Sequence, residues 1–208
     1  MYIDIPDITR YKSKQDIEIV LSVYAWASNV VDIDSQNFYV VEDFVISKFG
    51  QSPYDYLINN NVDFDECGSF LKLLTFNNLK TLLNKLRKCY NNKKDLETYY
   101  LSIVKDGKYA HITLSEIFGT GTGFPTKQSR CCFYTYYLLI YWMQNSVWQK
   151  LPQDTILLPC SDVLLNKAYE KRIIKKDKTP TLKNAIKLTN LAKEKYDDMY
   201  LMLDYILK

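Results

Sequence analysis

Residues 119–127 contain three glycines and a lysine, residue types that could bind an anion or supply a reactive amine. Gly119, Gly121 and Gly123 are half of the six glycines in the chain, and Lys127 follows them after Thr126. Glycines let a backbone approach another group closely, and free N–H groups at the next helix start favour an anion such as a DNA phosphate. A lysine at that helix start, when aromatic residues cover it, is a reactive amine because burial disfavours its charged form. The alternative is a mobile loop with Thr126 as a helix cap and Lys127 in solvent.

The spacing of these glycines excludes the two common nucleotide-binding loops. A P-loop needs G-x-x-x-x-G-K-[ST] after a buried strand, whereas here Lys127 follows a threonine and the preceding segment has a helical pattern. A dinucleotide fingerprint needs G-x-G-x-x-G after a strand, and GTGTG has neither that spacing nor that context. The pattern that remains is a helix, a glycine-rich turn and a second helix.

The histidine and cysteine content limits the other kinds of site. His111 is the single histidine, which nearly excludes a histidine-based metal centre and any catalytic triad that does not use His111. Five cysteines, without metal-type spacing, predict reduced thiols rather than a disulfide frame. We therefore expect no metal and no cofactor.

The charges are divided unevenly along the chain. Residues 1–66 hold 12 acidic and 4 basic residues, whereas residues 163–195 hold ten lysines and arginines against three acidic residues. Such a basic segment is either a solvated helical surface or one side of a protein that binds a polyanion.

The apolar segments are too short for a membrane protein. No apolar run reaches the roughly 18 residues that span a bilayer. The N-terminal residues carry acids where a signal peptide has a basic and then an apolar region. We expect a cytoplasmic protein, monomeric and without membrane contact.

Apolar residues at helical spacing, together with capping signals, predict an all-α fold of about ten helices. The predicted helices cover residues 12–31, 35–50, 51–59, 76–92, 113–118, 126–144, 161–175, 179–195 and 197–207. Ser52 as N-cap before Pro53 is a strong start signal, and Thr113 with Glu116 predicts a capping box. Without internal repeats or a long linker, residues 1–208 are expected to form a single domain.

Four stretches of the chain occur in an order that is typical of one family. They are DIEIVLSVYAWASN, FGQSPYDYLINN, LLTFNNLKTLLNKLRKCYNNKKDLETYY and VWQKLPQDTILLPCSDVLLNKAYEKRIIKKDKTPTLKNAIKLT. Together they resemble a widespread, poorly characterised bacterial family assigned to the helix-hairpin-helix DNA glycosylase superfamily, over residues 14–101 and 126–207. The resemblance implies two helical lobes that share a cleft, with the hairpin at about residues 112–144.

The resemblance also implies a catalytic pair. Bifunctional members of the superfamily carry a lysine at the start of the helix after the hairpin, and Lys127 occupies that position. Members use an aspartate at the start of the helix after a P-x-D turn; without gaps this position falls on Ser161, and Asp162 comes one residue later. Either the turn is reshaped so that it presents Asp162, or the role of the carboxylate has been lost.

DNA is the partner that the resemblance implies. A base inside a duplex must be flipped out and stacked on aromatic rings, a role open to Tyr134 and Trp142, although aromatic residues at helical spacing more often belong to the core. Basic side chains and the glycine turn would contact phosphates with little dependence on sequence. The predicted DNA-contacting residues are Gly119, Gly121, Gly123, Thr126, Arg130, Lys167, Lys171, Arg172 and Lys175.

Four functions are compatible with these features. A DNA glycosylase with lyase activity would use Lys127 to form a Schiff base with the sugar of a damaged or modified nucleotide. A phage-type transferase that adds an amino acid or polyamine to an activated thymine methyl group would tolerate the loss of the aspartate, because no glycosidic bond breaks. A DNA-binding module would keep the basic face without chemistry, and a protein-interaction domain would use a tyrosine-rich surface instead. We predict the glycosylase-like enzyme.

Overall fold

A computed structural model describes residues 5–30, 38–60, 62, 73–104, 108–126, 134–175, 179–195 and 205–206. Over these ranges the protein has nine α-helices, one 3-10 helix and no strand, which confirms the predicted all-α class. The elements are α1 (Lys14–Val30), α2 (Phe38–Phe49), α3 (Pro53–Asn59), α4 (Leu73–Asn92), α5 (Leu96–Ile103), α6 (Ala110–Phe118), α7 (Tyr134–Gln144), η2 (Gln153–Thr155), α8 (Asp162–Glu170) and α9 (Leu182–Lys195).

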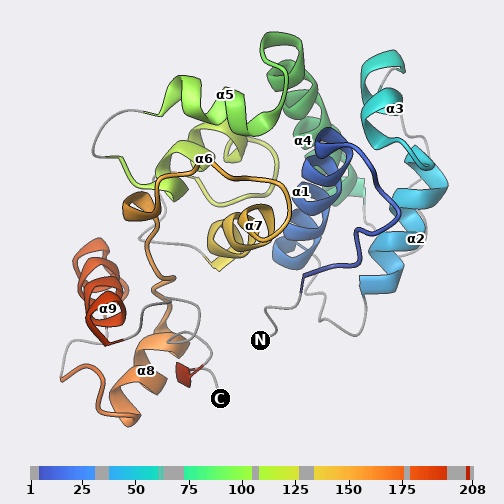
Figure 1. The fold of residues 1–208 in the computed structure, drawn as a ribbon. Helices are drawn as coiled ribbons and strands as arrows, with labels where there is room; N and C mark the ends of the chain where they lie inside the picture. Colours follow the sequence, from blue (N-terminus) through green and yellow to red (C-terminus); the bar gives the residue numbers. More distant parts are fainter. Residues whose placement is uncertain are drawn as a thin grey trace.

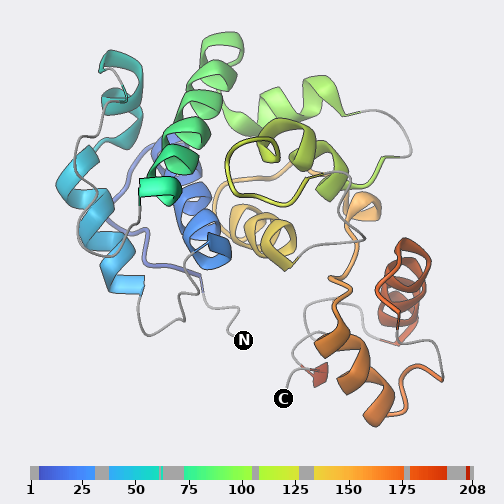
Figure 2. The same ribbon diagram turned by 180° about the vertical axis from the view of Figure 1, so that it is seen from behind.

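Helix α1 lies at the centre of the larger group of helices (Figure 1). It packs on α7 and also contacts α2, α3 and α4, while α6 packs on α7, α4 and α5. Every residue from Glu18 to Ala27 is buried, which is the pattern of a helix enclosed on all sides. Helices α8 and α9 lie together at one end of the molecule, opposite α2 and α3, and residues 156–161 lead to them (Figures 1 and 2).

Three helices differ from the sequence prediction. Helix α5 was not predicted. Helix α6 begins at Ala110, not at Thr113, because its buried face extends one turn towards the N-terminus and encloses Thr113 inside the helix; the predicted capping box is therefore wrong. Helix α8 ends at Glu170 rather than at residue 175, because the N–H of Ile173 bonds back to the carbonyl of Ala168. The predicted helix at 197–207 falls mostly outside the described residues.

Asp16, in the first turn of α1, caps the start of α3. Its Oδ1 accepts a hydrogen bond from the backbone N–H of Tyr54 at 2.8 Å and one from the Ser52 hydroxyl at 3.3 Å. Ser52 is the predicted N-cap, and its own oxygen accepts from the N–H of Asp55. Since Pro53 has no N–H, every donor in the first three positions of α3 has a partner.

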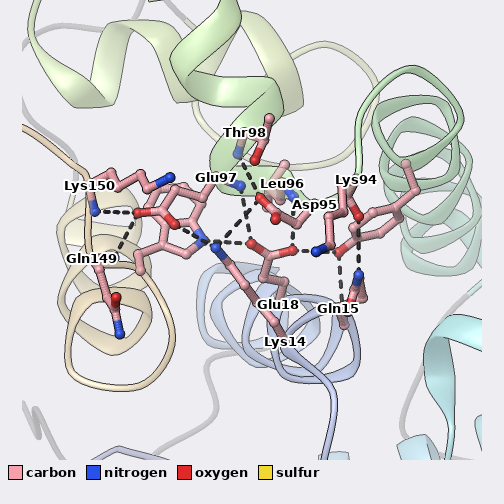
Figure 3. Close-up of polar contacts among 12 residues, drawn as sticks. Lys14, Gln15, Glu18, Lys94, Asp95, Leu96, Glu97, Thr98, Gln149 and Lys150 are labelled. Carbon is pink, nitrogen blue, oxygen red and sulfur yellow. Dashed lines mark hydrogen bonds and ion pairs between the residues drawn. The ribbon is translucent and has the colours of Figure 1, made fainter.

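Glu18 caps the start of α5 in the same way. The side chain is fully buried; Oε2 accepts from the N–H of Leu96 at 2.9 Å, and Oε1 accepts from the N–H of Glu97 at 3.1 Å. The N-cap residue Asp95 accepts from the next N–H along, that of Thr98, at 2.7 Å (Figure 3). A buried helix start would otherwise leave these donors without water or protein partners.

The carboxyl groups of Glu18 and Glu97 hold the segment that follows α7. The indole N–H of Trp148 donates to Glu18 Oε1 at 2.8 Å. Buried Glu97 accepts from the backbone N–H groups of Gln149 and Lys150 at 2.7 and 2.6 Å and pairs with Lys14 at 2.5 Å (Figure 3). We call Lys14, Glu18, Asp95, Glu97 and Trp148 the α1–α5 polar cluster. This cluster fixes where the chain leaves α7 on its way to α8.

The first prediction concerns Glu18→Gln. An amide nitrogen has no lone pair for an N–H, so one of the donors at the start of α5 or on Trp148 would be left buried and unpaired. We expect the free energy of unfolding to fall by about 2 to 3 kcal/mol, measured by urea unfolding at mildly acidic pH. The control Glu194→Gln changes an exposed carboxylate of α9 and should stay within about 0.5 kcal/mol of the wild type. Equal stability of the two variants would show that Glu18 does not cap α5.

The second prediction is the pH dependence of this contact. Burial raises the pKa of the Glu18 carboxyl from 4.5 to about 7, against the opposing effect of its N–H donors. Because the folded protein holds this proton more tightly than the unfolded chain, the contribution of Glu18 to stability is full below pH 4.5 and is lost as the pH rises through about 7. The stability difference between the wild type and Glu18→Gln should therefore narrow over that window. A difference that widens with rising pH would contradict it.

Candidate functional site

The glycine turn, residues 119–126, connects α6 to the segment that leads into α7. Its first residue, Gly119, closes α6 in a right-handed conformation, with its N–H bonded to the carbonyl of Ser115 at 2.9 Å. Gly121 and Gly123 have φ angles of 76° and 84°, a left-handed conformation that side chains other than glycine rarely adopt. The glycines at these two positions are therefore needed by the backbone path itself.

Buried polar contacts hold the inner side of the turn against α1, α4 and the end of α6. The indole N–H of Trp26 in α1 donates to the carbonyl of Thr122 at 2.8 Å. The Thr122 hydroxyl is buried too; it donates to the carbonyl of Phe118 at 2.5 Å and accepts from the N–H of Phe124 at 3.1 Å. The amine of Lys85 in α4 donates to the same Phe118 carbonyl at 3.3 Å. These bonds satisfy backbone groups at the end of α6 that would otherwise lack partners.

Aromatic packing fixes the far side of the turn. The ring of Phe124 lies between those of Phe118 and Tyr136, with ring centroids 5.4 and 5.6 Å apart. The Tyr136 hydroxyl donates to the carbonyl of Pro125 at 2.5 Å. Residues 119–126 thus contact α1, α4, α6 and α7. These contacts favour an ordered turn over the alternative of a mobile loop.

The exposed part of the turn is small and polar. Thr120, Gly121 and Gly123 face solvent, while Thr122 and Phe124 are buried. Of the other predicted DNA contacts, Thr126 is half-buried, and Gly119 is buried and has little exposed surface for the contact predicted for it. Lys85 is half-buried beside the turn, and burial lowers the pKa of its amine. Sequence reasoning missed both Trp26 and Lys85, because each lies on another helix and only the fold brings it to the turn.

The candidate catalytic lysine, Lys127, and the candidate phosphate contact Arg130 fall outside the described residues. Of the two candidate stacking residues, Tyr134 is half-buried at the start of α7, and burial raises the pKa of its hydroxyl. Trp142 is fully buried in the core. The stacking role predicted for Trp142 is wrong for this conformation, because neither face of its ring is open to a base.

The start of α8 carries the other catalytic candidate. Ser161 is the N-cap of this helix, and its hydroxyl accepts from the N–H of Leu164 at 3.2 Å. Asp162 is the first residue of the helix, and its side chain is exposed. The position at which the resemblance implies an aspartate thus carries a hydroxyl that caps the helix, with a carboxylate in solvent beside it. Within the described ranges, no hydrogen bond or ion pair joins Asp162 to the glycine turn.

The four basic candidates that follow are not equivalent. Lys167 is half-buried on α8. Lys171 donates to the carbonyl of Tyr205 at 2.5 Å, and its amine lies 4.5 Å from the centre of that ring. Arg172 and Lys175 are exposed. Because α8 ends at Glu170, these last three residues lie after the helix, whereas the sequence predicted a helix that extends to residue 175.

Other kinds of site find little support in the described part of the chain. No group of three His, Cys, Asp or Glu residues there could hold a metal ion. Burial lowers the pKa of His111 to about 4, and its ring stacks on that of Tyr109 at 6.2 Å. No helix in the described ranges is long and apolar enough to cross a membrane.

Comparison with known proteins adds no relative. No family model, no curated protein and no solved structure matches this chain. The resemblance to the glycosylase superfamily therefore stays a prediction. Three of its motifs do meet in the structure: DIEI supplies Asp16 and Glu18, which cap the helices that begin at SPY and at DLE.

The third prediction compares two glycine substitutions. A Cβ on Gly119 would lie 2.6 Å from the carbonyl oxygen of Ser115 and 3.0 Å from that of Pro125, both of them backbone atoms. We expect Gly119→Ala to lower the free energy of unfolding by about 2 to 3 kcal/mol, measured by urea unfolding. Gly50→Ala is the control, since a Cβ there meets nothing within 4 Å and only its left-handed φ of 66° is strained, at about 1 kcal/mol. A Gly119 variant as stable as the Gly50 variant would contradict the close approach.

Proposed function

We propose that the protein binds DNA and excises a damaged or modified base, as a divergent member of the helix-hairpin-helix glycosylase superfamily. The observation that carries this proposal is the anchored glycine turn. Two helices, α6 and α7, flank a turn whose exposed positions are Thr120 and glycines, and whose backbone is held by Trp26, Lys85 and Tyr136. An exposed backbone without bulky side chains suits close contact with a phosphate.

The charge distribution supports DNA as the partner. The C-terminal end of the chain is rich in basic residues: residues 163–195 hold ten of the 27 lysines and arginines against three acidic residues, and Arg172 and Lys175 there are exposed. This end is occupied by α8 and α9, and it lies opposite α2 and α3 in both views (Figures 1 and 2). A one-sided positive surface attracts a polyanion with an affinity that falls as salt is added.

The chemistry follows from the candidate lysine. In the proposed reaction a flipped nucleotide meets the Lys127 amine, whose nitrogen forms a bond to the anomeric carbon as the bond to the base breaks. The proton that the amine gives up as this bond forms passes to the departing base. The nitrogen gives its second proton to the ring oxygen as the sugar ring opens, and the resulting Schiff base allows β-elimination of the 3′ phosphate, which cleaves the strand. Asp162 would stabilise the positive charge that develops on the sugar or accept the proton of the amine.

A second candidate is the transferase that modifies a thymine methyl group in DNA. The observation that favours it is the hydroxyl of Ser161 at the position of the superfamily aspartate, where it caps α8 through the N–H of Leu164. Transfer to a methyl group breaks no glycosidic bond, so it has no need of a carboxylate that stabilises an oxocarbenium-like sugar.

The fourth prediction tests the proposed reaction. Incubation with duplexes that carry a panel of damaged and modified bases, in the presence of borohydride, should trap a covalent adduct with the wild type. Lys127→Ala should give none, because no amine is left to form the Schiff base. Lys93→Ala is the matched control, since Lys93 is exposed in the turn between α4 and α5, and it should retain the adduct.

The other outcomes separate the alternatives. DNA binding without adduct or base release across the panel would sink base excision. Mass analysis of hydroxymethyluracil-containing DNA, after incubation with the protein and amines, would then distinguish the transferase from a DNA-binding module without catalytic activity. Absence of any salt-dependent affinity for DNA would point to a protein-interaction domain.

A further inference from the structure

Helix α9 has a solvent face that was not among the predicted DNA contacts. Its buried face consists of Asn184, Ala185, Leu188, Thr189 and Ala192. Its exposed positions include Lys183, Lys187, Asn190 and Glu194, which follow one another at intervals of four, three and four residues and therefore form one stripe. Lys193 lies next to this stripe and is exposed as well.

The position of these lysines works against the stability of the helix. Lys183 lies in the first turn of α9, where no acidic residue is present. The N-terminal end of a helix carries partial positive charge, so a lysine there is unfavourable. Lys183 and Lys187 are also four residues apart, a spacing at which like charges repel.

These lysines have no compensating carboxylate. Among the described residues, Lys183, Lys187 and Lys193 form no ion pair, in contrast to Lys14 and Lys108, each of which lies within 4.0 Å of a glutamate oxygen. Nearby, Arg172 has a φ of 59°, the left-handed conformation at a helix end that glycine normally occupies. Lys183 at the helix start, its spacing from Lys187 and the left-handed conformation of Arg172 are each locally unfavourable. Each of them keeps a positive charge at the surface.

We infer that the exposed face of α9 binds the phosphate backbone of nucleic acid through Lys183 and Lys187. This inference rests on the proposed DNA function and extends the contact surface beyond the glycine turn. Charge complementarity selects the partner: the stripe and the neighbouring Lys193 carry three lysines against one glutamate, and a phosphate backbone neutralises lysines without a need for apolar contacts. A helix that enters a membrane surface needs a free apolar face, whereas α9 buries Leu188 against the protein and exposes one large apolar residue, Leu182.

The surroundings of α9 leave this face accessible. The helix is tied to the chain on its inner side, where the Thr189 hydroxyl accepts from the N–H of Leu158 at 2.9 Å. Its first turn is capped by Thr181, whose hydroxyl accepts from the N–H of Asn184 at 3.2 Å. In both views α9 lies at the outer end of the molecule beside α8 (Figures 1 and 2). Removal of the lysine charges should therefore leave the fold intact.

The test uses the double variant Lys183→Gln/Lys187→Gln and the matched control Lys93→Gln/Lys94→Gln, which removes two exposed charges from the turn between α4 and α5. Binding of a short fluorescent duplex is followed by anisotropy over a range of salt concentrations. The α9 variant should bind about tenfold or more weakly, and its slope of log affinity against log salt should fall by about 1.8, the value for two lost phosphate contacts. The control should keep the wild-type affinity and slope.

Thermal unfolding provides a second readout with the opposite sign. Lys183→Glu places a favourable charge at the start of α9 and removes the repulsion of Lys187, so the melting temperature should rise by roughly 1 to 4 °C. The same variant should bind the duplex more weakly than the wild type. A loss of affinity through general unfolding would instead lower the melting temperature.

Three results would overturn the inference, and they are distinguishable. Wild-type affinity and salt slope in the α9 variant, with a wild type that binds DNA, would remove α9 from the contact surface and leave the proposed function standing. Loss of binding to phosphatidylserine vesicles, with DNA binding unchanged, would assign the face to a membrane. A wild type without salt-dependent affinity for DNA would overturn the proposed function together with the inference.

Discussion

Two carboxylates in the first two turns of α1 are the constraint on which the arrangement of the other helices depends. A helix that begins inside a protein exposes N–H groups for which no water is available. Asp16 and Glu18 supply acceptors for the starts of α3 and α5, at sequence separations of 38 and 78 residues. Glu18 also accepts the indole N–H of Trp148, 130 residues away. One helical segment thus determines where two other helices begin and where the chain leaves α7.

Local signals made part of this fold predictable. Ser52 before Pro53 announced the start of α3, and the structure confirms Ser52 as N-cap. Helix α5 was missed because two of the three acceptors at its start come from Glu18, which no local pattern indicates. In the same way the glycine spacing predicted a turn at 119–126, but its anchors, Trp26 and Lys85, lie 96 and 33 residues from their partners. Contacts over such separations follow from the fold and not from the sequence near the turn.

The motifs behind the glycosylase resemblance carry packing more than chemistry. DIEI, SPY, DLE and Trp148 meet through Asp16 and Glu18, so these motifs describe how helices are capped and joined. The proposed chemistry depends on a different set, Lys127 and residues 161–162. In that set Ser161 departs from the superfamily pattern and uses its hydroxyl as a helix cap. These motifs therefore account for the arrangement of the helices, whereas the proposed base excision depends on Lys127 and Asp162.

The start of α9 differs from the starts of α3, α5 and α8, the last of which is capped by Ser161 and carries Asp162 in its first turn. The starts of α3 and α5 carry acidic side chains and acceptors, which match the partial positive charge of a helix N-terminus. The start of α9 carries Lys183 instead, and the turn after α8 holds Arg172 in a conformation that suits glycine. Residues that disfavour the local helix or turn conformation are typical of functional surfaces, where a residue is retained for binding rather than for stability. Each departure retains a positive charge, which supports the proposed contact of this surface with a phosphate backbone.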